Sequence, residues 1–311
     1  MNDQAQFERL INQIKMLKGS SSINKINKGY SNDQKFIVEK NNRLYLLKCF
    51  DLDELANKRA EYEAIQHLEF YKVNCSRGIE IDALPNEHLG YMLLTYTNGE
   101  EAADALHSYE ASVQYEIGVD AGKELAKMHQ WHAPDSIAPW YDRKLAKHEK
   151  YMEQYLKGEA RLKGDEQFLS FIDHHLHLMR GRPNLFQHDD FHVGNLIVEQ
   201  GKLAGVIDFN RFDWGDPIHD FLKAGMFSSE VSVPFTIGQI KGYHGNEEPD
   251  EHFWTLYSLY LAMTIVSSIV WILKVRPTEL AIMQQKLYRV LEDHDSFNNV
   301  IPSWYLEGRT Q

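Results

Sequence analysis

QHDDFHVGNLIVEQGKLAGVIDFNRFDWGDP, residues 187–217, is the stretch of this 311-residue chain that decides its fold. Two short apolar runs inside it, residues 195–198 and 204–207, predict β-strands. The residues between the runs form a polar turn that contains a glycine, and such a turn between two strands predicts a hairpin. We therefore expect a rigid hairpin with polar side chains at its open end.

Three oxygen-bearing side chains stand at the ends of this hairpin: Asp190 and Asn195 before the first strand, and Asp208 after the second. Both ends of a hairpin open on the same side, so we expect the three to converge. Carboxylate and amide oxygens suit Mg²⁺. The order His188-x-Asp190-x4-Asn195 followed by Asp208-Phe209 matches the base and metal ligands of phosphoryl-transfer enzymes. Turn formation alone explains each residue but not all of them in this order.

The same stretch resembles the aminoglycoside phosphotransferase-type kinases, small-molecule relatives of the protein kinases. The resemblance rests on the His-x-Asp-x4-Asn motif, on Ile-Asp-Phe at residues 207–209 and on Gly-Asp-Pro-x-x-Asp at residues 215–220. It implies an α+β, two-lobe protein-kinase-like fold, with a small β-rich lobe over residues 1–97 and a larger helical lobe over residues 98–311. One departure is Asp189, which stands where the family usually has glycine.

The resemblance also implies roles for individual residues. Asp190 would be the catalytic base, and His188 would support its loop. Asn195 and Asp208 would hold Mg²⁺, and Asp220 would hold the backbone of the loop. The phosphoryl donor would be ATP or GTP.

In the small lobe, predicted strands at residues 23–28 and 35–38 flank a turn that contains Gly29, Ser31 and Asn32. By itself this sequence is more typical of a plain hairpin turn. Backbone N–H groups in such a turn can face phosphate oxygens. The family has a similar Gly-x-Ser-Asn turn above its nucleotide, so the resemblance implies that these three residues bind phosphate.

A lysine lies in the middle of the next predicted strand, residues 43–50. A strand lysine is usually solvated, but the resemblance implies that Lys48 holds the nucleotide phosphates and is oriented by a glutamate of the following helix. That helix is predicted over residues 54–70. Glu61 fits the family pattern best, and Glu63 stays possible.

The last strand of the small lobe is predicted over residues 90–96. Extended backbone at the crossover to the large lobe can bond to the edge of a nucleotide base. We therefore expect Thr95, Tyr96 and Thr97 to lie near the base.

Apolar residues at helical spacing predict an opening helix at residues 7–17 and further helices in the large lobe. These lie at residues 115–131, 140–157, 166–179, 221–227 and 278–292. Residues 253–273 carry no formal charge and are long enough to cross a bilayer. Their several hydroxyl side chains favour a buried helix in the large lobe instead.

Composition limits the class of partner and the compartment. The net charge is −12, from 33 basic and 45 acidic residues, which disfavours nucleic acid as a partner. Only two cysteines occur, without the spacing of a zinc site or a disulfide framework. The N-terminus lacks a secretory pattern. We expect a cytoplasmic enzyme without a membrane partner.

The acceptor is the least determined part of the prediction. The resemblance and the acidic composition favour an aminoglycoside-type antibiotic, with Asp213 and Glu230 as candidate ligands for its ammonium groups. Macrolides, choline, homoserine and sugars are alternatives within the family. Two other classes stay open: a metal phosphohydrolase that uses His129 and His192 as ligands, and a pseudokinase that binds nucleotide without turnover.

Overall fold

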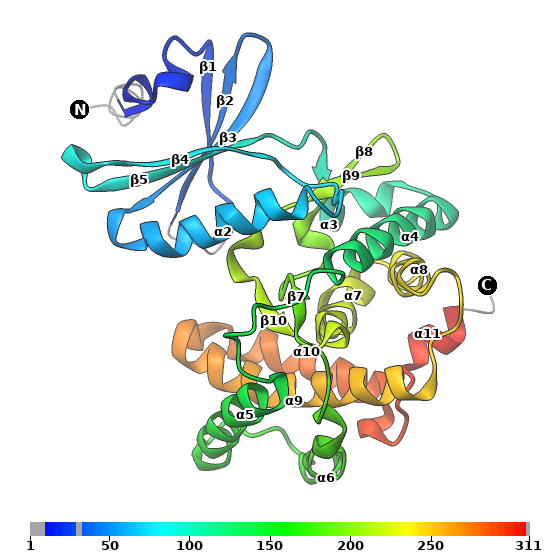
Figure 1. Cartoon of the computed structure of the whole chain (residues 1–311). Coiled ribbons are helices and arrows are strands. Elements are labelled where there is room, and N and C mark those ends of the chain that lie inside the picture. The colour runs from blue at the N-terminus through cyan, green and yellow to red at the C-terminus, as the bar shows by residue number, and fades with distance from the viewer. Residues whose placement is uncertain (1–9, 29–32, 309–311) are drawn as a thin grey trace. The chain divides into compact units, whose positions relative to one another are not determined.

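Two units of structure are formed by this chain, which a computed structural model describes over residues 10–28 and 33–308. The first unit is Met1–Asn98 with Gly205–Asn210, and the second is Gly99–Ala204 with Arg211–Gln311. The first is built on a β-sheet and the second is mainly helical (Figure 1). This is the α+β composition that the sequence predicts.

The first unit contains a five-stranded antiparallel sheet of order β1-β2-β3-β5-β4. Its strands are β1 (Ser22–Ile26), β2 (Gln34–Lys40), β3 (Arg43–Asp51), β4 (Gly78–Leu84) and β5 (Leu89–Thr95). β4 was not predicted. The register pairs Lys48 of β3 with Lys35 of β2 and Met92 of β5, so Lys48 lies at the centre of the sheet.

The two faces of this sheet have different partners. Leu47 and Cys49 of β3 pack in one hydrophobic cluster with Leu10, Ile11 and other residues of the N-terminal segment. Helix α2 (Leu55–Leu68) packs against β4 and β5. Because side chains alternate along a strand, Lys48 points away from the cluster that holds its two neighbours.

Residues 205–210 belong to the first unit, although the sequence placed everything after residue 97 in the second lobe. The backbone explains this. The N–H of Val206 donates to the carbonyl of Asn74 at 2.9 Å, and Val206 forms a parallel bridge with Cys75. The segment that follows the hairpin, including Asp208, is thereby attached to the connection between α2 and β4 of the first unit.

The second unit is built from helices and short strands. The helices are α3 (Ala102–Ala105), α4 (Ala111–Met128), α5 (Trp140–Lys157), α6 (Glu166–His175), α7 (Ser229–Val231), α8 (Val233–Tyr243), α9 (Glu251–Val275), α10 (Leu280–Asp293) and α11 (Ser303–Gly308). The strands are β6 (Glu100–Glu101), β7 (Leu185–Gln187), β8 (Leu196–Glu199), β9 (Lys202–Val206) and β10 (Asp213–Gly215). β6, β8 and β9 form one small sheet, and β7 pairs with β10.

Helix α9 is the apolar helix that the sequence predicts to be buried. It packs against α5, α6 and α10. Among the described residues it is the one helix long and apolar enough to cross a membrane, yet 67% of its most apolar window is buried inside the protein. A buried core helix passes the same test of length and composition, so this is weak evidence for a membrane span.

Helices α4 and α8 pack with their backbones almost in contact. A Cβ atom at Gly118 would lie 2.0 Å from the carbonyl oxygen of Phe235, and one at Gly122 would lie 2.1 Å from that of Gln239. The reciprocal positions on α8 are also glycines, at residues 238 and 242. Four glycines spaced one turn apart therefore set the distance between these helices.

The segment after Asp220 corrects one prediction. Residues 221–227 do not form an α-helix: a 3-10 helix, Pro217–Phe221, is followed by a π-helix, Ala224–Ser228. Arg289 of α10 donates hydrogen bonds to the carbonyls of Gly225 and Met226, at 3.0 Å each. Carbonyls used by a side chain in this way favour the wider turn, and short π-helical turns are frequent at functional sites.

Candidate active site

Lys48 is a buried lysine that is paired with a buried glutamate. It is 3% exposed, and its Nζ lies 2.7 Å from Oε1 of Glu61, which is 2% exposed. Glu61 lies on the buried face of α2 with Ala64 and Ile65, whereas Glu63 is exposed. The choice that the sequence left open is therefore decided in favour of Glu61.

Asp208 joins this pair within the first unit. Its Oδ1 lies 3.5 Å from Nζ of Lys48, and its Oδ2 lies 3.6 Å from Nζ of Lys35. Its φ of 67° is in the left-handed region, which aspartate tolerates better than most residues. Burial acts to lower the pKa of Lys48, but the charges of Glu61 and Asp208 outweigh burial and raise it. Lys48 therefore remains an ammonium group that can face phosphate oxygens.

The loop that follows β7 is held by a buried carboxylate in the second unit. Asp220 is 1% exposed and accepts hydrogen bonds from the backbone N–H groups of His188 (2.9 Å) and Asp189 (2.8 Å). The Nε2 atom of His129 lies 3.1 Å from the same carboxylate, and its Nδ1 lies 2.9 Å from the hydroxyl of Tyr243. Asp220 thus fixes the backbone next to Asp190.

Asp190 is the partly exposed carboxylate of this loop. The Nδ2 atom of Asn195 donates to the backbone carbonyl of Asp190 (2.9 Å) and to its Oδ2 (3.3 Å). Its Oδ1 lies 2.8 Å from Nζ of Lys223 and 3.7 Å from Nε2 of His192. Burial acts to raise the pKa of Asp190, but the nearby His192 and the charge of Lys223 lower it strongly. Asp190 is therefore an ionised acceptor, able to orient a hydroxyl group.

Sequence reasoning missed Lys223 as a neighbour of Asp190 and treated His192 only as a possible metal ligand. The one signal for Lys223 is its position three residues after Asp220, close to the end of the motif. The phosphohydrolase reading fails here, because both ring nitrogens of His129 face protein groups, Asp220 and a tyrosine hydroxyl.

Asp189, which replaces the usual glycine, has its own buried partners. Its Oδ1 lies 3.4 Å from Nδ1 of His219, and Lys144 donates to Nε2 of His219 at 2.7 Å. Burial raises the pKa of Asp189 to about 6, while burial and the charge of Lys147 lower the pKa of Lys144 to about 7. The extra carboxylate thus lies beside a histidine, which in turn accepts a hydrogen bond from a lysine.

Asp216 is the second buried acid of the Gly-Asp-Pro-x-x-Asp motif. Arg182 binds it with two hydrogen bonds, of 2.6 Å and 2.9 Å. The hydroxyl of Tyr260 donates to it at 2.7 Å, and the N–H of Ile218 donates at 3.0 Å. A fully buried carboxylate with four donors is a structural anchor for the turn.

Three predicted phosphate-binding residues lie outside the described residues: Gly29, Ser31 and Asn32. Thr95, Tyr96 and Thr97 are half-buried at the end of β5. The N–H of Thr95 donates to Arg77 (2.9 Å) and that of Tyr96 to Leu44 (3.3 Å). A nucleotide base that bonds here must therefore use other backbone groups than these two donors.

The two carboxylates suggested for the acceptor are already paired. Nη1 of Arg143 lies 3.1 Å from Oδ1 of Asp213. Glu230 accepts a hydrogen bond from Lys286. An ammonium group of an acceptor would have to displace a cation of the protein at each position.

Asn195 and Asp208 offer oxygen donors of the type that Mg²⁺ prefers. The amide nitrogen of Asn195 is used by Asp190, so its Oδ1 is the end of the amide that can bind a cation. Asp208 offers a half-buried carboxylate beside two lysines. Each of the two side chains, taken by itself, thus offers an oxygen of the type that suits a hard divalent ion.

Solved structures with a similar fold share one activity in their names. The GDP complex of an aminoglycoside 2'-phosphotransferase-IIIa mutant has a TM-score of 0.71 and 14% identity, and covers 94% of this chain and 99% of its own. An aminoglycoside phosphotransferase APH(4)-Ia mutant with AMP-PNP and hygromycin B has a TM-score of 0.70 and 14% identity, with 91% and 97% covered. The gentamicin complex of APH(2")-IIa has a TM-score of 0.64 and 19% identity, with 95% and 98% covered.

These TM-scores over almost the whole of each chain establish a shared fold, and they confirm the protein-kinase-like prediction. Comparison with curated protein sequences gave no match. The model of the phosphotransferase enzyme family matches residues 22–256, which include both Lys48 and the Asp190 loop. The chain therefore belongs to the phosphotransferase enzyme family and is a kinase-type phosphotransferase that acts on a hydroxyl group.

Proposed function

We propose that this enzyme transfers the γ-phosphate of ATP or GTP to a hydroxyl group of a small molecule in a Mg²⁺-dependent reaction. The observation that carries the proposal is the Asp190 loop. Its base is bonded to Asn195, and its backbone is held by buried Asp220. A loop fixed in this way suits a reaction that depends mainly on positioning and on neutralising charge.

Each residue would have a distinct role. Lys48, oriented by Glu61, would hold the α- and β-phosphates. Asn195 and Asp208 would hold Mg²⁺, which neutralises phosphate charge when it is bound. Asp190 would accept a hydrogen bond from the acceptor hydroxyl and take its proton during transfer.

The remaining predicted residues would serve the nucleotide. The turn with Gly29 and Ser31, together with Asn32, would cover the phosphates with backbone N–H groups. The segment from Thr95 to Thr97 would lie near the nucleotide base.

His188 would support the catalytic loop. We also propose a cytoplasmic location, without a nucleic acid or membrane partner.

An aminoglycoside-type antibiotic is the first acceptor to test, because the names of several similar structures include one. Resistance to the antibiotic would follow from its phosphorylation. The charges argue less strongly for this acceptor: Asp213 and Glu230, which would receive its ammonium groups, already hold Arg143 and Lys286.

The test is a phosphate-transfer screen with the purified protein, Mg²⁺ and either nucleotide. The acceptors are aminoglycosides, macrolides, choline, homoserine, sugars and hydroxylated acids, and ³¹P NMR identifies the product. We expect a phosphate ester of one acceptor class, formed only with Mg²⁺. Nucleotide binding without any transfer over the whole set would instead support the pseudokinase reading.

A further inference from the structure

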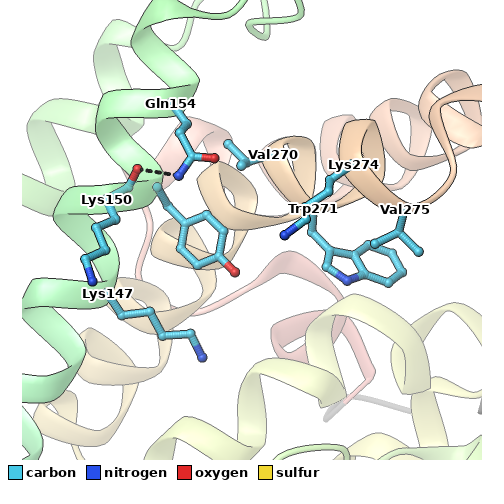
Figure 2. A pocket seen from close by; sticks show the side chains of 8 residues that line it. Lys147, Lys150, Gln154, Val270, Trp271, Lys274 and Val275 are labelled. Atoms are coloured by element: carbon cyan, nitrogen blue, oxygen red, sulfur yellow. Dashed lines mark hydrogen bonds between the residues drawn. The ribbon is translucent and has the colours of Figure 1, made fainter.

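A hollow of about 410 Å³ lies between α5 and α9 in the second unit. Figure 2 shows the side chains around it. It is lined by Lys147, Lys150, Tyr151, Gln154, Val270, Trp271, Lys274 and Val275. Three of these side chains are lysines, and none of the eight is an acid. The hollow is thus a cationic concavity in a chain whose net charge is −12.

Its positive charge is not balanced locally. Within the described part of the chain, Lys147, Lys150 and Lys274 form no ion pair with a carboxylate. Two other cations of α5 do: Arg143 pairs with Asp213, and Lys157 pairs with Glu153 at 2.6 Å. Positive charges gathered in a concave surface raise the local concentration of anions. An anionic ligand would also relieve the repulsion among the three lysines.

Helix α5, which forms one wall of the hollow, also contacts the Asp190 loop through Lys144 and His219. Lys144 lies one helical turn before Lys147 and donates to His219, which in turn lies 3.4 Å from Asp189, the neighbour of Asp190. The charge of Lys147 is among the causes that lower the pKa of Lys144. Residues 144 and 151 are about 10 Å apart along the helix, which is the length of a small molecule.

The wall of the hollow also suits an apolar or flat group. Trp271 is 40% exposed and Val275 is 49% exposed at the end of α9, whereas most apolar residues earlier in this helix are buried. Tyr151 adds a second aromatic ring from α5. Binding sites for small molecules combine apolar and aromatic walls with a few placed polar groups.

We propose that the hollow between α5 and α9 binds the acceptor, and that the acceptor is a hydroxylated acid with an aromatic or apolar part. The proposal rests on the proposed phosphotransferase function and names its class of substrate. Lys147, Lys150 and Lys274 bind the acidic group, and Trp271 packs against the apolar part. The acceptor is accordingly not a polycation.

Binding is tested with 8-anilino-1-naphthalenesulfonate, an anionic aromatic probe, followed by fluorescence. The variant of the hollow, called the groove variant, carries Lys147→Gln, Lys150→Gln and Lys274→Gln. The matched control carries Lys123→Gln, Lys157→Gln and Lys163→Gln, which change the net charge equally at exposed sites elsewhere in the second unit. We expect the groove variant to bind the probe at least about tenfold more weakly than wild type, and the control to bind normally. Equal binding by the two variants overturns the site.

The role as acceptor site is tested by transfer to three matched alcohols: 4-(hydroxymethyl)benzoate, its neutral amide and 4-(aminomethyl)benzyl alcohol. We expect the acid to have the highest kcat/KM and the groove variant to lose that preference. A preference for the amine, or an aminoglycoside as the best acceptor of the wider screen, overturns the proposal while the kinase assignment stands. Titration with Mg²⁺–ADP is read separately: failure of the wild type to bind it contradicts the proposed function and leaves the result with the anionic probe valid.

Discussion

Asp189 keeps a backbone conformation that is typical of glycine while it carries a charge. Its φ is 57°, in the left-handed region that glycine enters without cost and aspartate enters more readily than most residues. The position where related kinases have glycine therefore keeps its shape. The added carboxylate is placed against His219 and, through it, Lys144.

Asp190→Asn is expected to reduce phosphoryl transfer by at least about a hundredfold, because an amide cannot take the proton of the acceptor hydroxyl. The amide keeps the size of the side chain and one oxygen that can accept from Asn195. Steady-state kinetics and nucleotide titration measure the two effects. Nucleotide affinity should stay close to wild type, and near-normal turnover would show that Asp190 is not the base.

Asp208→Ala is expected to weaken Mg²⁺–nucleotide binding and turnover together, since Asp208 is the carboxylate proposed to hold the metal. The variant also removes a negative charge 3.5 Å from Lys48, so nucleotide without metal serves as the reference. Calorimetric titrations with and without Mg²⁺ separate the two effects. If the variant gained as much affinity from Mg²⁺ as the wild type does, the metal would have another ligand.

At the scale of elements, the contact of α4 with α8 supports the loop that carries Asp190. His129 follows the last turn of α4 and Tyr243 ends α8, and the two side chains meet next to Asp220. The glycines that bring the helices together therefore also set the position of the carboxylate that binds the loop. A change in the distance between α4 and α8 is therefore expected to shift Asp220 and, with it, the backbone next to Asp190.

Gly118→Ala is expected to destabilise the protein by about 3 kcal/mol, because its Cβ would lie 2.0 Å from a backbone carbonyl that can move only with its helix. Chemical denaturation gives the change in the free energy of unfolding. Gly158→Ala at the end of α5 is the control, since the nearest atom to its added Cβ is 3.2 Å away. Equal stability of the two variants would mean that the helices separate at little cost.

At the scale of the whole molecule, buried histidines link stability to pH. His294 is fully buried between α10 and α11, and its Nδ1 lies 2.9 Å from the carbonyl of Asn299. Burial lowers its pKa to about 4. Because the unfolded chain has the ordinary histidine pKa of about 6.5, it binds more protons than the folded chain between pH 6.5 and 4. The contribution is complete above pH 6.5 and is lost as the pH falls toward 4.

His294→Asn keeps a donor for Asn299 and cannot be protonated. We expect the wild type to lose up to about 1.4 kcal/mol of stability per pH unit more than this variant between pH 6.5 and 4. Asp189 acts in the opposite direction, since burial raises its pKa to about 6, so the difference between the proteins is the measured quantity. His177→Asn, at an exposed site, should behave as wild type. Identical pH profiles for all three would exclude this role of His294.

The sequence alone determined the class of fold and the positions of the polar residues at the ends of the hairpin. The spacing from His188 to Asn195 and the hairpin before Asp208 are local features, and local spacing is visible in a sequence. The strand position of Lys48 followed from alternation in the same way. β4 was not predicted because acids interrupt its apolar residues, and the helix predicted over residues 221–227 proved to be the end of a 3-10 helix followed by a π-helix.

Only the tertiary structure decided which charges meet. The pairing of Asp190 with Lys223 and of Asp213 with Arg143 joins side chains from different elements, so no spacing along the chain reveals it. The same holds for the hollow between α5 and α9, where lysines distant in sequence face one space. The net charge of −12 suggested a cationic acceptor. An acceptor, however, interacts with the charged side chains that line its own site, and the packing of the helices decides which side chains those are.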